Sequence, residues 1–141
     1  MRCKPTAMMI SLMLATLFGG AASAQEALYK RLGGYDAIAA FVDELIAQVR
    51  EEKFRGFSTS SQQRVRQNIV EFVCHATGGP CKYSGRDIKT AHAGIGISKN
   101  DWSRFVTVFS ATMNKFKVPE PEQKELAALL LPLEKDIVEK P

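Results

Sequence analysis

The stretch YSGRDIKTAHAGIGIS, residues 83–98, decides how this chain is interpreted. It carries one histidine, His92, and no further groups that would complete a ligand set for a bare metal ion. A single axial histidine is sufficient when the metal arrives in a porphyrin, because the macrocycle supplies four of the bonds to the iron. The stretch therefore favours haem over zinc. The alternative is a structural histidine that satisfies its hydrogen bonds among small residues.

Two glycine pairs frame this stretch. Gly33-Gly34 ends the segment LYKRLGG, residues 28–34, and Gly78-Gly79 lies in CHATGGPCKYSGRDIKTAHAGIGIS, residues 74–98. Together these motifs resemble the group I truncated haemoglobins, in which a second glycine pair precedes a short, loop-rich segment that bears the proximal histidine. The resemblance covers nearly all of the chain after residue 25. It implies an all-α truncated globin domain, a two-on-two helical sandwich around haem.

The first 24 residues are typical of an export signal. Arg2 and Lys4 form a basic start, an apolar run covers residues 7–18, and Ala22-Ser23-Ala24 is the small-residue pattern of a cleavage site. A retained membrane anchor is the alternative, but the run is shorter than the roughly 20 residues that a span needs. We therefore expect a signal peptide over 1–24, a truncated globin domain over 25–141, a periplasmic location and no membrane attachment after cleavage.

Size and charge narrow the function further. Residues 25–141 are enough for one domain with one core but too few for two. Removing Arg2 and Lys4 with the signal lowers the formal net charge from +4 to +2. A charge this small, without a basic cluster, gives no support for nucleic-acid binding.

The cysteines agree with export. Cys3 would leave with the signal, so the mature chain keeps only Cys74 and Cys81, an even pair in a compartment where disulfides persist. A bridge between them would close a loop of about eight residues and stabilise the fold by about 2.5 kcal/mol. The alternative is two unrelated thiols.

Apolar periodicity predicts helices and no strands. Helices are expected over 28–32 and 35–51. A third is expected to begin at the capping-box patterns Thr59-x-x-Gln62 and Ser60-x-x-Gln63 and to run to about Ala76. A fourth should follow a cap at Ser98 or Asn100, and the last should bend at Pro132. Their apolar stripes are Ile38, Phe41, Val42, Leu45, Ile46 and Val49; Val65, Ile69, Phe72 and Val73; Trp102, Phe105, Val106, Phe109, Met113 and Phe116; and Leu126, Leu130, Leu133 and Ile137. Cys74 is expected to point nearly opposite the second of these stripes. By themselves these stripes indicate only a small all-α domain, and a cofactor-free helical interaction domain is the alternative function.

The resemblance assigns a haem pocket to particular residues. It implies that His92 ligates the iron through the ring nitrogen farthest from the backbone. The remaining pocket residues that it implies are Phe57, packed on the haem; Leu45 and Ile46, facing the gas; and Val65, Ile69, Phe72 and Val73, completing the wall. Lys89 and Arg86, one and two helical turns before His92, are candidate partners of the haem propionates, although both could equally be ordinary solvated charges.

The haem is expected to be haem b, held without a covalent bond. Cys74-His75 looks like the end of a C-x-x-C-H attachment motif, but position 71, where the first cysteine would stand, is Glu71. His75 is also a poor second iron ligand, because it lies about 110° around the helix from the apolar face of Val65, Ile69 and Phe72. We expect it at the surface.

The gas-binding side departs from the family pattern. The usual distal tyrosine is matched by Ile46 and the usual distal glutamine by Ile69, so the wall lacks a hydrogen-bond donor unless Asn68, at its edge, turns inward. Bound oxygen carries partial negative charge, and a buried donor would stabilise it by roughly 1.5–3 kcal/mol. Tight oxygen storage is therefore not expected.

These observations predict a haem protein that reversibly binds a diatomic gas: oxygen, nitric oxide or carbon monoxide. The alternative on the same haem is an enzyme, a nitric oxide dioxygenase or a weak peroxidase. A dioxygenase needs a reductase that the sequence does not identify, and efficient peroxide cleavage needs a distal acid–base pair that the sequence does not supply.

Overall fold

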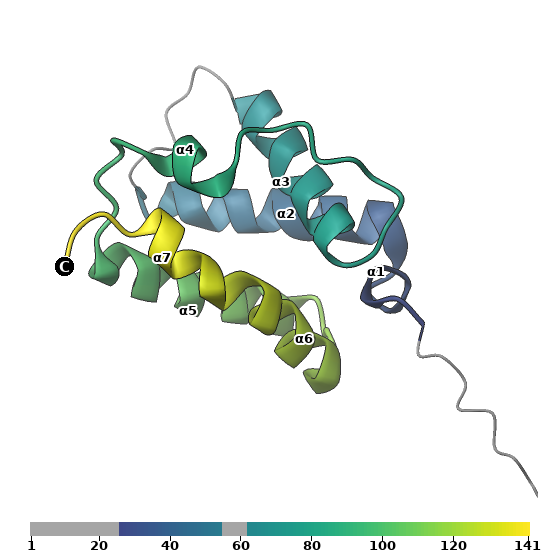
Figure 1. The fold of residues 1–141 in the computed structure, drawn as a ribbon. Helices are drawn as coiled ribbons and strands as arrows, with labels where there is room; N and C mark the ends of the chain where they lie inside the picture. The colour runs from purple at the N-terminus through teal and green to yellow at the C-terminus, as the bar shows by residue number, and fades with distance from the viewer. Residues whose placement is uncertain (1–25, 55–61) are drawn as a thin grey trace, which may run out of the picture.

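The computed structural model describes residues 26–54 and 62–141 (Figure 1). Their helices are α1 Leu28–Arg31, α2 Gly34–Glu51, α3 Gln62–Ala76, α4 Ile88–His92, α5 Lys99–Lys115, α6 Glu120–Leu130, the 3-10 turn η2 Leu131–Leu133 and α7 Glu134–Ile137. Within these two ranges the only extended pairing is a single parallel bridge between Ser98 and Lys140. The all-α prediction is confirmed. The predicted signal peptide and Phe57 lie outside the described residues.

Local sequence signals set several helix boundaries. Gly33 has a φ of +97°, a left-handed conformation that suits glycine and separates α1 from α2. Ser98, rather than Asn100, caps α5: its side chain accepts the backbone N–H of Asp101, and the Asp101 side chain accepts the backbone N–H of Ser98. The expected bend at Pro132 is the turn η2, which separates α6 from α7. These boundaries follow the predictions closely.

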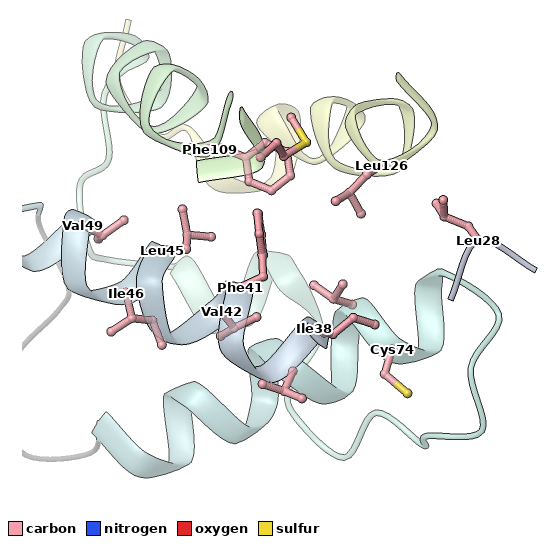
Figure 2. Packing of buried hydrophobic residues seen from close by; sticks show 13 residues of the cluster. Leu28, Ile38, Phe41, Val42, Leu45, Ile46, Val49, Cys74, Phe109 and Leu126 are labelled. Carbon is pink, nitrogen blue, oxygen red and sulfur yellow. The ribbon is translucent and has the colours of Figure 1, made fainter. Parts of the chain in front are cut away.

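The helices form two layers with the core between them. Helix α2 packs against α3 on one side and α5 on the other, and α6 and α7 continue the layer of α5 (Figure 1). Figure 2 shows Phe109 of α5 and Leu126 of α6 facing the buried side chains of α2. The ring of Phe41 meets that of Phe109 edge to face, with centroids 5.6 Å apart. The predicted two-on-two arrangement is confirmed.

Cys74 lies deeper in the molecule than the sequence suggested. The helical projection places it opposite the apolar face of α3, yet it is fully buried and forms a disulfide with Cys81. Gly79 makes this possible, because a Cβ on that residue would lie 2.7 Å from Cys74 Sγ and 2.5 Å from the Tyr29 ring. Helix α3 thus buries a second edge, Val70 and Cys74, which its predicted stripe did not include. The predicted disulfide is confirmed.

Candidate functional site

The two helical layers and α4 enclose a cavity of about 310 Å³. This volume lies at the lower end of the range of ligand pockets, about 300–1,000 Å³. Its walls come from α2, α3, α4, α5, the loops around α4 and the C-terminal helices, and they are mainly aliphatic and aromatic. The polar side chains that reach it are those of Asn68, Tyr83, Arg86, His92 and Asp101. An apolar cavity with a few polar groups suits a largely hydrophobic ligand.

His92 is the last residue of α4 and lines this cavity. Its Nδ1 lies 2.7 Å from the carbonyl oxygen of Ile88, one turn earlier. Because a carbonyl only accepts, Nδ1 carries a proton, so in the neutral ring Nε2 has the free lone pair. Nε2 has no hydrogen-bond partner among the described residues. The imidazole is thus oriented and in the tautomer that a metal ligand needs.

A single oriented imidazole fits an axial ligand better than it fits a bare-metal site. The part of the chain that the structure describes contains no group of three His, Cys, Asp or Glu side chains placed to hold a metal ion. A haem needs only one protein nitrogen, together with apolar surface for its ring. The residues around His92 supply both, so they fit this group.

The short helix α4 depends on its cap. The Asp87 carboxylate accepts the backbone N–H of Thr90 at 2.9 Å, and hydrogen bonds from the Thr90 side chain and backbone lower the pKa of Asp87. The helix therefore begins only at Ile88. Arg86 precedes this cap, so the expectation that Arg86 lies two helical turns before His92 is wrong. A turn of chain, not a helix, carries Arg86 to the cavity.

The wall made by α2 and α3 contains the expected apolar residues. Those that line the cavity are Leu45, Ile46, Val65, Ile69, Phe72 and Val73. Asn68, half-buried on α3, is the polar side chain that these two helices add to the lining. The structure therefore places Asn68 on the same wall as Ile46 and Ile69.

Several lining residues were not assigned to the site from the sequence. Trp102, Phe105 and Phe109 of α5 form a row, with centroids 5.7 Å apart for the first pair and 6.1 Å for the second. Their helical spacing was visible but indicated only packing. Ile95 and Ile97 also line the cavity from the loop after α4, where no periodicity could reveal them.

Of the two predicted propionate partners, only Arg86 lines the cavity. Arg86 is exposed and lines the cavity, and its guanidinium makes no hydrogen bond or ion pair within the described ranges. The Tyr83 hydroxyl donates to the Arg86 carbonyl oxygen at 2.5 Å, and burial raises the pKa of Tyr83. Lys89 is exposed and does not line the cavity. His75 is also exposed, as expected, with Nδ1 3.2 Å from the Cys81 carbonyl oxygen.

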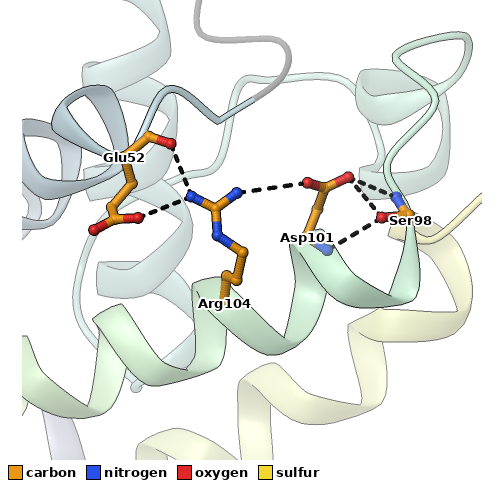
Figure 3. Close-up of polar contacts among 4 residues, drawn as sticks. All are labelled: Glu52, Ser98, Asp101 and Arg104. Atoms are coloured by element: carbon orange, nitrogen blue, oxygen red, sulfur yellow. Dashed lines mark hydrogen bonds and ion pairs between the residues drawn. The ribbon is translucent and has the colours of Figure 1, made fainter.

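A polar network joins the end of α2 to α5, and one of its members, Asp101, lines the cavity (Figure 3). Arg104 donates to the Glu52 carbonyl oxygen at 2.9 Å and to the Glu52 carboxylate at 2.8 Å, which ties the end of α2 to α5. Its guanidinium lies 4.7 Å from the centre of the Phe54 ring, which lines the cavity. On the other side Arg104 faces Asp101, whose carboxylate caps α5 at Ser98. The network holds Phe54 and Asp101 at this end of the cavity.

Comparison with known proteins agrees with this geometry. Residues 27–139 match the family model described as bacterial-like globin. The Group 1 truncated hemoglobin GlbN of Mycolicibacterium paratuberculosis is 29% identical over 112 residues, which cover 78% of this chain and 82% of that protein. The corresponding protein of a Synechocystis species is 29% identical over 110 residues, covering 72% of this chain and 87% of that protein.

Solved structures show the same fold. The truncated hemoglobin of Tetrahymena pyriformis in its Fe(III) form superposes with a TM-score of 0.72 at 22% identity, covering 80% of this chain and 98% of that one. The 2/2 hemoglobin of a Synechococcus species, described with covalently attached heme, gives a TM-score of 0.72 at 20% identity over the same shares of the two chains.

Proposed function

This chain belongs to the bacterial-like globin family, and we propose that it holds haem b with His92 as the axial ligand and reversibly binds a diatomic gas. The observation that carries the proposal is the state of His92, whose Nδ1 proton is donated to Ile88 while Nε2 is left unbonded beside an apolar cavity. When bound, the haem supplies the iron at which the gas is taken up. The chain supplies the axial ligand of the iron, the apolar cavity around the haem and the selectivity among gases.

Gas selectivity follows from the α2–α3 wall. Ile46 is buried and Ile69 half-buried, and both line the cavity, so neither can donate a hydrogen bond to a polarised gas. Oxygen is more polarised on binding than carbon monoxide, so it gains less from this wall than from one with a buried donor. We therefore propose a gas-exchange or scavenging role with fast oxygen release rather than oxygen storage.

Arg86 is the proposed partner of a haem propionate. It lines the cavity rim, and its guanidinium makes no hydrogen bond or ion pair within the described residues, so it can donate to a carboxylate. Lys89 does not line the cavity and is the weaker candidate. Arg86→Ala should therefore weaken haem retention more than Lys89→Ala, as measured by haem transfer to an acceptor protein.

Attachment of the haem is proposed to be non-covalent. The two cysteines among the described residues, Cys74 and Cys81, are joined to each other and so cannot bond to the haem through sulfur. His75 is exposed and does not line the cavity. Extraction of the haem into acidified organic solvent should therefore leave a colourless protein, and retained colour would refute this part of the proposal.

Export of the protein is proposed from residues 1–24 and supported by the disulfide. Disulfides such as Cys74–Cys81 persist in an oxidising compartment like the periplasm, whereas in the cytoplasm they are rare. None of the helices in residues 26–54 and 62–141 is long and apolar enough to cross a membrane. N-terminal sequencing of periplasmic protein should begin at Gln25, and a chain that starts at Met1 in the membrane fraction would refute the proposal.

The decisive experiment is an absorption spectrum of the purified protein during titration with haem. Wild type should saturate at one haem per chain with the spectrum of a histidine-ligated iron. His92→Ala should abolish stoichiometric retention and regain it only with added imidazole. His75→Ala is the matched control, because His75 is the chain's other histidine. This variant should bind haem as wild type does. Full occupancy and an unchanged spectrum in His92→Ala would show that another residue is the ligand.

The yield of nitrate distinguishes a nitric oxide dioxygenase from a protein that only binds gas on the same haem. Nitrate should accumulate with multiple turnovers when nitric oxide, oxygen and a reductase are supplied to a dioxygenase. Each nitrate formed leaves ferric iron, so a gas binder whose iron the reductase does not efficiently reduce should stop at about one equivalent of nitrate per haem. The measurement requires no knowledge of the natural reductase, since a non-specific flavin reductase can be used.

A further inference from the structure

The C-terminal tail closes on the loop that follows His92. One Glu139 carboxylate oxygen accepts the backbone N–H of Gly94 at 2.7 Å, and the other accepts that of Gly96 at 2.5 Å. Both glycines have positive φ, +79° and +76°, a conformation that other residues adopt only with strain. Their N–H groups converge on one anion, as in the backbone concavities that bind anions elsewhere. Here the anion is the chain's own side chain.

Backbone hydrogen bonds extend this contact. The N–H groups of Glu139 and Lys140 donate to the Ile97 carbonyl oxygen at 2.9 and 3.2 Å, and the N–H of Lys99 donates to the Lys140 carbonyl oxygen at 3.2 Å. The tail therefore lies along the loop over several residues rather than touching it at one point. The hydrogen bonds to its carboxylate also lower the pKa of Glu139, Gly94 contributing most.

The clamped loop is directly continuous with His92. Gly94 is two residues beyond it, and the Ile95 N–H donates back to the His92 carbonyl oxygen at 3.3 Å. Helix α4 has only five residues, so its last turn cannot be held by helical hydrogen bonds alone. At its start it has the Asp87 cap, along its length it packs against α7, and beyond its end the tail holds the loop that follows His92.

We propose that Glu139 is a positioning residue for His92: its carboxylate fixes the backbone at 94–96 and thereby the height and tilt of the imidazole at the end of α4. Two contacts then fix the orientation of His92. The Ile88 carbonyl oxygen holds its ring, and the Glu139 carboxylate holds the backbone that follows it. The inference rests on the proposed function in one respect, that His92 is the iron ligand. The clamp itself is independent of haem.

The test in loaded protein is Glu139→Gln, which removes the charge and replaces one accepting oxygen by a donor. Haem transfer to an acceptor protein should become about tenfold faster, as expected for loss of a hydrogen bond to a charged group. The iron–histidine stretching band of the ferrous protein should shift or broaden in resonance Raman spectra. Glu120→Gln is the matched control, because Glu120 makes only an exposed ion pair with Lys124, and it should change neither quantity.

A second readout uses haem-free protein and nuclear magnetic resonance. In Glu139→Gln, hydrogen exchange should accelerate at Gly94 and Gly96 and also at the His92 Nδ1 proton, which the Ile88 carbonyl protects in wild type. Wild type that takes no haem would refute the proposed function, while exchange at His92 would still decide the positioning role. If Glu139→Gln does not fold, Glu139→Asp, which keeps the charge with a shorter reach, should show the same changes more weakly.

Either of two results would overturn the inference. Faster exchange at Gly94 and Gly96, with the His92 proton and the iron–histidine band as in wild type, would show that Glu139 only fastens the C-terminus. Unchanged exchange at both glycines would show that the clamp is absent in solution.

Discussion

The two sides of the cavity are built by different physics. The α2–α3 wall consists of regular helical stripes whose side chains are held by apolar packing. The wall around α4 consists of five helical residues between loops, held by carboxylates that accept backbone N–H groups and by a nearby disulfide. The first wall should therefore respond to changes in side-chain volume. The second should respond to loss of charge, to acid and to reduction.

The largest effect is expected on the packed side. Phe41 is buried on α2 and meets the rings of Phe109 and Phe116 edge to face, so Phe41→Ala should lower the free energy of unfolding by about 3–5 kcal/mol. Denaturant unfolding followed by circular dichroism measures this. Tyr35→Ala, at an exposed position of the same helix, should change it by less than about 0.5 kcal/mol. Similar losses in both variants would contradict a packing-dependent wall.

Removing the disulfide tests the loop-rich side. Cys81→Ser should lower the free energy of unfolding by about 2.5 kcal/mol, because the unfolded chain regains the freedom of the opened loop. The haem spectrum should stay nearly unchanged, since neither cysteine lines the cavity. Reduction of wild type should reproduce the loss, and Cys81→Ser should then be insensitive to reductant. Two alkylatable thiols in unreduced exported protein would refute the bridge.

A donor added to the packed wall should change gas release without changing the fold. Ile46→Tyr should slow oxygen dissociation by at least about tenfold, which corresponds to a new buried hydrogen bond of about 1.4 kcal/mol, with a much smaller effect on carbon monoxide. Stopped-flow displacement of oxygen by carbon monoxide measures the rate. An unchanged rate in a folded, haem-loaded variant would mean either that residue 46 does not face the iron or that Asn68 already supplies the donor. Oxygen release from Asn68→Ala separates these two explanations. It should speed release only if Asn68 already donates to the gas.

The smallest effect on stability is expected from protonation of Glu71 in acid, because its carboxylate is open to solvent. Glu71 accepts the Ser84 hydroxyl at 2.7 Å and its N–H at 3.2 Å, and these bonds, with one from Gln67, lower the pKa of Glu71 below its usual 4.5. A carboxyl whose pKa is lower in the folded state stabilises the fold above its unfolded pKa, and this contribution disappears as the pH falls through the folded value.

The check for this prediction is the melting temperature of wild type and Glu71→Gln from pH 7 downward. The two curves should differ at neutral pH and converge in acid, below the usual carboxyl range. A difference that persists unchanged into strong acid would show that Glu71 acts through its shape and not through its charge.

Much of the fold could be predicted because it depends on near neighbours. The stripe from Ile38 to Val49 repeats at helical spacing, and glycine, serine and proline end or begin helices through their own backbone chemistry. Prediction was less successful for α3, where Cys74 seemed to point outward. A helical projection compares residues of one helix only, and Cys74 is covered by Tyr29 and Gly79 from elsewhere.

The candidate site divides in the same way. The sequence by itself determined that the chain is helical, that His92 is its candidate axial ligand, and that Ile46 and Ile69 leave the opposite wall apolar. Tertiary structure alone decided that Asn68 and Arg86 line the cavity while Lys89 does not, and that Glu139 holds the loop beyond His92. The physical reason is range. Helical periodicity and capping act over three or four residues, whereas the Glu139–Gly94 hydrogen bond joins residues 45 apart and exists only once the helices have packed.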